Sequence, residues 1–506
     1  MPEPILRMEE ITKVFPGVVA NDRVTFEVAP GEVHALLGEN GAGKTTLMNV
    51  LTGLYRPDGG KIYMDGREVR IPSPKAAIRE GIGMVHQHFM LVPTFSVVQN
   101  VAMGLRETRN PMLHLDRLAD EVRTLAERFK MDLDPQAITE LLPLGTRQKI
   151  EILKALYRKA RLLILDEPSA VLTPQEFAEL ARTLRTLVEE GVSIVFISHK
   201  LEEVMKVTDR VTVLRQGQVV ETVRTAETSP SELARMMVGR PVVFDFAKAE
   251  RLPGPPVLEL EEVCVEDDHG VVLLNDLSLV VRRGEILGIA GVDGNGQREL
   301  AEVIFGLGTP RSGTVRVKGE DIRGWTPRDL TARSVGRIPQ DRHGMGLILD
   351  LTVRENLLLE RFHEQPFCRR GFLKGRVIEE QSRSLIRDYD IRPPSQTLSI
   401  AALSGGNQQK VIFARVMFKP PDLLIAMNPT RGLDVGATEF VYKKILEQRE
   451  KGSAILFISS ELSEIMSLSD RIAVLYEGRI QGEVAGPEAD ELTLGLWMAG
   501  ALAEAS

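Results

Sequence analysis

The chain has 506 residues, of which 43% are hydrophobic and 26% are charged, a balance that excludes a disordered or fibrous protein. Its net charge of −8 argues against a broad basic surface that tracks nucleic acid. Two cysteines, Cys264 and Cys368, are too few for a disulfide framework or a cysteine-rich zinc site, and they indicate a reducing, intracellular compartment. The opening MPEPILRMEE holds acids and a proline where a signal peptide has an apolar core, and no run approaches the roughly 18 apolar residues of a spanning helix.

The first half of the chain alternates short β-branched runs with helical patterns. In chain order we expect a strand over 32–38, a helix over 45–54, a helical subdomain over about 88–141, a strand over 161–168, a helix over 173–191 and a strand over 192–198. Thr173, Pro174 and Glu176 supply an N-cap, a first-turn proline and a capping-box partner for the helix that they begin. This alternation predicts an α/β domain with a mainly parallel sheet.

The second half of the chain repeats the first. Similar blocks occur in the same order, at 31–47 and 284–300, at 142–149 and 403–410, at 162–169 and 423–430, and at 196–203 and 457–464. The second copy has a short insertion between its RIPQ and LSGG blocks. This pattern indicates duplication of a domain of about 240 residues. We predict a first domain over 1–240, a linker over 241–256 that contains PGPP, and a second domain over 257–506.

A glycine-rich turn in the first copy has the pattern of a phosphate-binding loop. GENGAGKT, from Gly38 to Thr45, satisfies G-x-x-x-x-G-K-[ST] between an expected strand and an expected helix. The glycines let backbone N–H groups surround phosphate oxygens, Lys44 neutralises the β- and γ-phosphates, and the Thr45 hydroxyl is a Mg²⁺ ligand. The alternative is a chance glycine-rich turn, which this context makes rare.

An acidic strand end follows, as a phosphate loop requires. In LLILDEP, Asp166 is expected to hold the Mg²⁺ shell and Glu167 to polarise the attacking water. The alternative is a strand that ends in a solvated acidic turn.

The second copy contributes LSGGNQQ at 403–409. Ser404, Gly405 and Gly406 open an expected helix, so their N–H groups and the hydroxyl can face an anion. The alternative is a helix N-cap with no ligand.

These motifs, together with Gln87 and His199, resemble an ATP-binding cassette, and the duplication resembles the tandem cassette ATPase of an importer. The resemblance covers essentially the whole chain and implies two tandem P-loop NTPase domains. Each would have a mainly parallel sheet core, a helical subdomain and an N-terminal antiparallel β subdomain. The first-half GVVANDRVTFEVAPGEVHALLGENGAGKTTLMNVLTGLYRPDGG and the second-half PTRGLDVGA are most similar to the simple-sugar and nucleoside uptake subfamily, and GMVHQHFMLVPTFSVVQN resembles its nucleoside branch.

The resemblance implies roles for individual residues. Glu167, His199, Lys44 and Gln87 would be catalytic, and Thr45, Gln87 and Asp166 would hold Mg²⁺. ATP would be bound by Phe15, Gly38, Glu39, Asn40, Gly41, Ala42, Gly43, Lys44, Thr45, Thr46, Ser404, Gly405, Gly406 and Asp434. Phe15 would stack on adenine, with a core aromatic as the alternative.

The two copies depart from the family pattern at complementary places. The second copy has Gln297, Arg298, Met427, Asn428 and Ser460 where the motifs require other residues, and the first copy has Pro143, Leu144 and Thr173. Because cassettes of this family pair head to tail, every retained residue falls in one composite site and nearly every lost one in the other. We therefore expect one hydrolytic site per chain. Arg298 either binds phosphate in the vacated cation position or is a solvated helix residue.

The function implied is the energy-coupling ATPase of an importer, with ATP and Mg²⁺ as cofactors. Its partners would be integral-membrane permease subunits and an extracytoplasmic solute-binding protein, with no nucleic acid, at the cytoplasmic face of the inner membrane. Nucleosides are favoured over simple sugars as the solute. The competing classes are a soluble tandem-cassette translation factor, which normally keeps two working sites and a long charged linker, and a DNA-repair cassette, which needs zinc modules.

Overall fold

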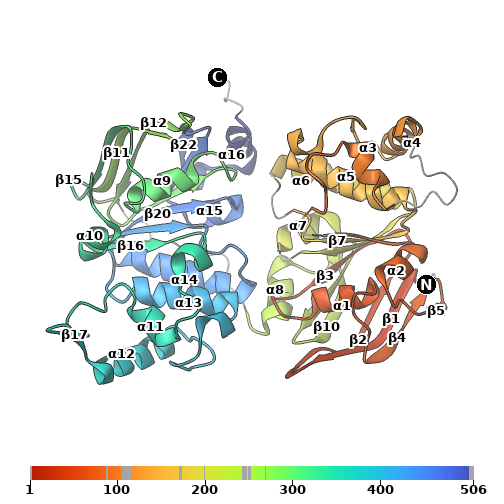
Figure 1. Cartoon of the computed structure of the whole chain (residues 1–506), viewed down its shortest axis with the longest axis horizontal. Coiled ribbons are helices and arrows are strands. Elements are labelled where there is room, and N and C mark those ends of the chain that lie inside the picture. The colour runs from red at the N-terminus through yellow and green to blue at the C-terminus, as the bar shows by residue number, and fades with distance from the viewer. Residues whose placement is uncertain are drawn as a thin grey trace. The chain divides into compact units, whose positions relative to one another are not determined.

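The computed structural model describes residues 3–86, 89–104, 115–169, 172, 174–198, 200–241, 248, 252–267 and 269–500. The chain divides into two compact units, residues 1–242 and 243–506, each of which has its own sheets and helices (Figure 1). Within the described ranges, no helix is both long and apolar enough to cross a bilayer.

The first unit begins with an antiparallel sheet whose strand order is β2-β1-β4-β5. Its strands are β1 (Leu6–Phe15), β2 (Val18–Val28), β4 (Gly59–Met64) and β5 (Arg67–Val69). Alternate residues of β1 and β2 are buried, which is the pattern of a sheet with one face on the core. The antiparallel β subdomain expected from the family resemblance is therefore present.

The second sheet of this unit has six strands in the order β10-β9-β3-β8-β7-β6. They are β3 (Val33–Leu37), β6 (Ile82–Val85), β7 (Leu162–Asp166), β8 (Ser193–Ile197), β9 (Arg210–Arg215) and β10 (Gln218–Arg224). Only β10 runs antiparallel to its neighbour. All residues of β3 and β8 are buried, as expected where helices cover both faces of a parallel sheet. The predicted parallel α/β core is confirmed.

Helices of the first unit follow the predicted order. They are α1 (Lys44–Leu51), α2 (Pro74–Arg79), α3 (Val97–Ala102), α4 (Leu115–Arg128), α5 (Leu144–Tyr157), α6 (Pro174–Glu189), α7 (Leu201–Val207) and α8 (Pro230–Val238). Since α3 and α4 lie in the described part of 88–141 and no named strand lies there, the predicted helical subdomain is confirmed for that part. On α6, Leu180, Leu184 and Leu187 are buried on one stripe. Pro174 opens α6 as predicted, whereas Thr173, the predicted N-cap, lies outside the described residues.

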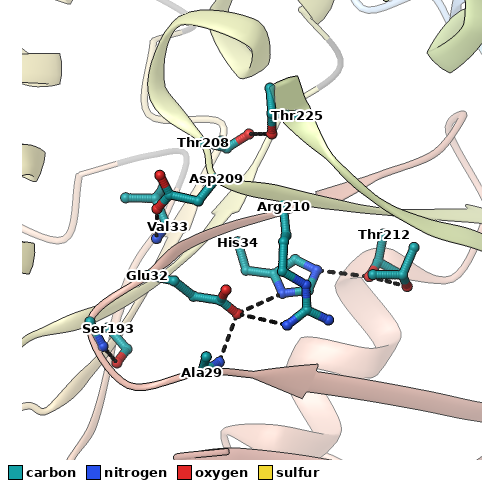
Figure 2. A network of polar contacts seen from close by, with 12 residues as sticks. Ala29, Glu32, Val33, His34, Ser193, Thr208, Asp209, Arg210, Thr212 and Thr225 are labelled. Atoms are coloured by element: carbon teal, nitrogen blue, oxygen red, sulfur yellow. Dashed lines mark hydrogen bonds and ion pairs between the residues drawn. The ribbon is translucent and has the colours of Figure 1, made fainter. Parts of the chain in front are cut away.

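A buried polar network fixes the start of β3, the strand that leads into the glycine-rich turn (Figure 2). The Glu32 carboxylate accepts hydrogen bonds from Ala29 N (2.7 Å), His34 Nδ1 (3.2 Å) and Arg210 Nη1 (3.3 Å). His34 Nε2 lies 2.8 Å from the Thr212 hydroxyl of β9. Burial lowers the pKa of His34, although its bond to Glu32 opposes the shift, so the imidazole is neutral near pH 7.

The second unit repeats this architecture. Its antiparallel sheet has the order β12-β11-β14-β15, with β11 (Pro256–Glu266), β12 (Val272–Arg282), β14 (Ser312–Val317) and β15 (Glu320–Asp321). Its six-stranded sheet has the order β16-β19-β20-β13-β21-β22, with β13 (Ile286–Ala290), β16 (Val335–Ile338), β19 (Leu423–Met427), β20 (Ala454–Ser459), β21 (Arg471–Tyr476) and β22 (Arg479–Ala485). Each strand occupies the place of its counterpart in the first unit. At the positions of His34 and Thr212, the second unit has buried Leu287 and Ala473.

The helices of the second unit also match those of the first. They are α9 (Gln297–Ile304), α10 (Pro327–Ala332), α11 (Val353–Leu358), α12 (Gly375–Asp388), α13 (Gly405–Val416), α14 (Val435–Glu450), α15 (Leu462–Leu468) and α16 (Glu491–Met498). A two-stranded hairpin of β17 (Cys368–Arg369) and β18 (Phe372–Leu373) lies between α11 and α12, and most of the corresponding segment of the first unit lies outside the described residues.

Candidate active site

The glycine-rich turn of the first unit joins the end of β3 to the start of α1. Gly43 has φ +101°, and a Cβ there would lie 2.3 Å from the Ala20 carbonyl oxygen and 2.6 Å from Asn21 Nδ2. Only glycine fits this position without a shift of neighbouring backbone. Asn21 is fully buried and donates from Nδ2 to the Gly43 carbonyl (3.1 Å), so it holds the turn from β2.

Lys44 curls back over this turn. Its Nζ donates to the carbonyl oxygens of Gly38 (2.6 Å) and Glu39 (3.0 Å), and the residue is only 8% exposed. Glu39, Asn40, Gly41 and Ala42 form the bend, closed by a bond from Ala42 N to the Glu39 carbonyl (3.0 Å). The turn therefore brings together an ammonium group and the N-terminus of α1, which is the arrangement that binds a phosphate. Thr45, on the first turn of α1, is exposed, and Thr46 is half-buried.

The predicted acidic pair lies at the same edge of the sheet. Asp166 ends β7, and Glu167 follows with φ +47° and donates its backbone N–H to the Ile197 carbonyl of β8 (2.9 Å). Burial, and then the neighbouring Glu167 carboxylate, raise the pKa of Asp166, while the charge of Lys44 opposes the shift. The carboxyl ends of β3 and β7 thus place a cation and two carboxylates around one region.

These side chains fit a nucleotide-bound metal better than a dedicated metal cage. Among the residues that the structure describes, no group of three or more His, Cys, Asp or Glu side chains could hold a metal ion. Mg²⁺ typically takes one or two carboxylates and completes its shell with phosphate oxygens and water. The raised pKa of Asp166 marks a carboxylate that a divalent cation would stabilise in its charged form.

The LSGG segment forms the start of α13 in the second unit. Ser404 occupies the N-cap, but its side chain makes no bond to the backbone of the helix and instead accepts from Asn407 Nδ2 (2.9 Å). Asp434 caps the adjacent α14 by accepting from Ala437 N (2.8 Å). A Cβ on Gly406 would lie 3.9 Å from Asp434 Oδ2, so the fold brings Asp434 and the LSGG segment together.

Gly405 faces a residue that the sequence analysis missed. The atom nearest to a Cβ at this position would be Arg342 Nη2, at 3.5 Å. Arg342 donates from Nη1 to the Arg431 carbonyl (3.0 Å), and burial lowers its pKa. No local pattern marks this arginine, because it reaches Gly405 across about sixty positions of sequence. The one sequence feature that could have pointed to Arg342 is that it follows Gln340, the counterpart of Gln87, by two residues.

The corresponding loop of the second unit has a similar backbone conformation, but the side-chain amide of Gln297 occupies it. Gly296 has φ +104°, close to the value at Gly43. Gln297, in the position of Lys44, donates from Nε2 to the Val292 carbonyl (2.9 Å) and accepts from Asn295 N (3.2 Å). The loop is thus closed on itself by a neutral side chain.

Arg298 does not point into that loop. Its Nε pairs with Glu302 Oε1 at 2.7 Å, one helical turn along α9, and its side chain is 75% exposed. Of the two interpretations from the sequence, the structure matches a solvated helix residue.

The other substitutions also keep the backbone and change the chemistry. Asn428 has φ +41° and donates its N–H to the Ile458 carbonyl (2.7 Å), as Glu167 does in the first unit. Its side-chain oxygen accepts from Ser460 N (3.0 Å). Met427 is a buried apolar residue where the first unit has Asp166. At the start of α5, Leu144 is 38% exposed in the position of Gly405.

Phe15 is not a core aromatic. It ends β1 half-buried, with its ring edge-on to Tyr55 at 5.4 Å and the Lys13 ammonium 5.5 Å from its centroid. Tyr55, which is 39% exposed, lies in the first-half segment quoted for the resemblance, but no pattern there assigned it a role. Three predicted site residues, Gln87, Thr173 and His199, lie outside the described residues.

Comparisons with known proteins agree with this geometry. A family model described as ABC transporter matches residues 21–170 and 274–431. The chain is 50% identical to the guanosine import ATP-binding protein NupO of Bacillus subtilis (strain 168) and 45% identical to the nucleoside import ATP-binding protein NupA of Lactococcus lactis subsp. cremoris (strain MG1363). Both alignments cover 98% of this chain and 98% of the relative.

A relative named for a different solute has a similar sequence identity to this chain. The glucose import ATP-binding protein TsgD13 of Haloferax volcanii (strain ATCC 29605) is 46% identical, over 98% of this chain and 96% of the relative. The family model matches both halves of the chain, and these relatives align with nearly its whole length. The chain therefore belongs to the ABC transporter family and is a tandem ATP-binding cassette ATPase.

Proposed function

We propose that this ATPase drives the uptake of nucleosides through partner permease subunits. The observation that carries the proposal is the likeness, over nearly the full chain, to import ATP-binding proteins named for guanosine and for nucleosides. The HQHFMLVP segment at 86–93 points the same way. The glucose import relative, at 46% identity, makes a simple sugar the second candidate. These full-length relatives are named for import, so a translation or repair role has less support.

Hydrolysis would occur at a single composite site. The first cassette would supply Lys44, Thr45, Asp166 and Glu167, together with Gln87 and His199, and the second would supply Ser404, Gly405, Gly406 and Asp434. The support is the distribution of the substitutions, because this set has every motif side chain that could bind or activate ATP. The replacements Gln297 and Asn428 instead form hydrogen bonds within their own unit. Phe15 would stack on the adenine ring from its half-exposed place at the end of β1.

Each residue of the first cassette would have a distinct task. Lys44 would exchange its bonds to the Gly38 and Glu39 carbonyls for phosphate oxygens, and its charge would then offset the charge that develops during phosphoryl transfer. Glu167 would orient the attacking water and accept its proton. Asp166 and the Thr45 hydroxyl would hold Mg²⁺, which when bound draws charge from the β- and γ-phosphates.

The partners would be two integral-membrane permease subunits and an extracytoplasmic solute-binding protein, with the ATPase at the cytoplasmic face of the inner membrane. We propose that Gln87 and the helical subdomain over 88–141 receive a cytoplasmic permease helix. The support is placement: in the sequence, Gln87 directly precedes the helical, least sheet-like part of the cassette that contains α3 and α4.

The test is solute-stimulated ATP hydrolysis. The chain should be co-purified with its permease and assayed with the binding protein loaded with a nucleoside, with ribose, with galactose or with glucose. We expect a nucleoside-loaded binding protein to stimulate hydrolysis, and Gln87→Ala to reduce that stimulation more than nucleotide binding. Stimulation by a sugar alone would transfer the proposal to the second candidate, and no stimulation by any of them would refute an import role.

A further inference from the structure

The hairpin of β17 and β18 has no part in the proposed site. It lies in the stretch between the RIPQ and LSGG blocks, within which the second copy has its extra residues. Arg370 and Gly371 form its turn, with φ of +52° and +82°, the left-handed pair that suits a two-residue hairpin. Figure 1 shows the segment with β17 extending from the body of the second unit near α11 and α12. The hairpin is therefore a built projection rather than a connecting loop.

The base of the hairpin is fixed to the core of the helical subdomain. Phe367 is only 3% exposed, and its ring lies 5.5 Å from the ring of Phe418. Lys374 N donates to the Phe367 carbonyl (2.8 Å), and Cys368 N donates to the Glu364 carbonyl (2.9 Å). Because the base is held in this way, the exposure of the tip follows from the fold.

The tip, residues 369–376, is both apolar and basic. Phe372 is 80% exposed and Leu373 is 57% exposed. Four exposed cations surround them, namely Arg369, Arg370, Lys374 and Arg376. The sequence has no acidic residue between Glu364 and Glu379, and none of the four cations forms an ion pair with another described residue. This local excess of positive charge stands against a net charge of −8 for the whole chain.

Such a surface matches an anionic phospholipid bilayer. Negative headgroups attract clustered Lys and Arg, while an aromatic and a leucine side chain insert at the boundary between headgroups and acyl chains. A protein partner is less favoured, since a stable interface buries about 800 Å² on each side and a tip of eight residues exposed on both faces offers little of it. We propose that the hairpin tip binds the anionic lipid surface beside the permease. This inference rests on the proposed function, which brings the chain to a membrane.

The test is flotation of the full-length chain with lipid vesicles. One set of vesicles contains equal parts of phosphatidylglycerol and phosphatidylcholine, and the other contains phosphatidylcholine alone. We expect flotation with the anionic vesicles only, weakened by salt at about 0.5 M. Phe372→Ser with Leu373→Ser, and separately Arg369→Ser with Arg370→Ser, should each reduce vesicle partitioning roughly tenfold or more.

Matched controls separate the hairpin from the rest of the surface. Leu492→Ser, 70% exposed on α16, and Arg23→Ser, 73% exposed in the first unit, should leave flotation unchanged. Basal ATP hydrolysis should be the same in all variants, which shows that they are folded. Equal flotation of wild type and hairpin variants, or none with anionic vesicles, would overturn the inference. Loss of permease co-purification with unchanged flotation would also overturn it and identify a protein contact.

Failure of this inference is distinguishable from failure of the proposed function. A chain whose hydrolysis responds to loaded binding protein but whose hairpin variants float like wild type keeps its import role and loses only the lipid contact. A chain with no such response loses the import role, whatever the vesicles show.

Discussion

The glycine-rich loops of the two units share a backbone conformation but differ in the charge of the side chain that closes them. Gly43 and Gly296 adopt φ of +101° and +104°, and in each unit an added Cβ would meet the preceding antiparallel sheet within 3 Å. At the next position, Lys44 is a cation whereas Gln297 is a neutral amide tied to its own loop. Both units have the glycine because the fold needs it, while only the first has the cation, at the loop where we propose that phosphate binds.

The turns that follow β7 and β19 show the same combination of a shared backbone and different side chains. Glu167 and Asn428 share a left-handed φ and a backbone bond to the neighbouring strand, so the strained turn survives without a carboxylate. Behind the loops, buried Asn21 contacts Gly43 in the first unit, and a leucine, Leu274, lies against Gly296 in the second. The backbone conformation is therefore the same in both units, while the chemical groups of neighbouring side chains differ.

The largest effect that would break this comparison is on turnover. Glu167→Gln keeps the shape of the side chain but removes the base, and loss of a general base typically lowers the rate about 10²–10⁴-fold. Asn428→Ala should leave turnover within about threefold, because no base exists there. Steady-state ATP hydrolysis with the permease present is the measurement. Equal damage from both changes would show two working sites.

A second test exchanges residues at the helix starts. Gly405→Leu should lower ATP hydrolysis roughly 10²-fold, comparable to loss of a donor at a developing negative charge. The atom nearest to a Cβ at position 405 would be Arg342 Nη2, at 3.5 Å, so a Cβ there makes an ordinary van der Waals contact within its own unit. Leu144→Gly, the matched change in the first unit, should be silent. A harmless Gly405→Leu would contradict the composite site.

Restoring the second loop should separate binding from hydrolysis. Gln297→Lys with Arg298→Thr returns a cation and a hydroxyl, and a charge-assisted bond contributes about 1.5–3 kcal/mol, or roughly 10–100-fold in affinity. Equilibrium dialysis should therefore detect about one nucleotide per wild-type chain and a second in the variant. Turnover should stay within about twofold, since Met427 and Asn428 supply no carboxylate. A large gain in turnover would refute our account of that site.

The smallest expected effect concerns acid sensitivity of β3. The folded-state pKa of His34 lies below its unfolded value near 6.5, so the stability from the neutral imidazole is complete above pH 6.5 and is lost as pH falls through the folded pKa. Burial raises the pKa of Glu32, but the bonds from His34 and Ala29 together with the charges of His34 and Arg210 outweigh it, so the pKa is lowered and Glu32 stays ionised there. Arg210 is the other charged group that faces the imidazole.

We therefore expect amide-exchange protection of β3 to fall several-fold between pH 7.5 and 5.5 relative to β13, which has Leu287 at this position. His34→Leu with Thr212→Ala, the residues of the second unit, should remove the difference. Equal pH dependence of both strands in the wild type would show that the buried histidine has no such effect.

The sequence predicted best what local chemistry determines. The phosphate loop, the LDE strand end and the LSGG helix start are set by glycines, caps and buried runs that lie within a few residues of each other. Contacts between distant segments left no such pattern: Arg342 beside Gly405 and Tyr55 beside Phe15 depend on packing that periodicity does not encode. The sequence predicted extra residues between the RIPQ and LSGG blocks but no hairpin, because Phe372 cannot be told from a core aromatic by its residue type.

Duplication within one polypeptide has a consequence for heredity. In a pair of identical chains, every mutation appears at both sites at once, so a defect such as the loss of the Lys44 cation would abolish all activity. Two copies within one gene, as in the units 1–242 and 243–506, can accumulate different mutations. One complete set of catalytic residues would then be enough to keep the protein active. Covalent linkage also fixes the ratio of the two halves at one to one, so synthesis never yields pairs of inactive halves alone.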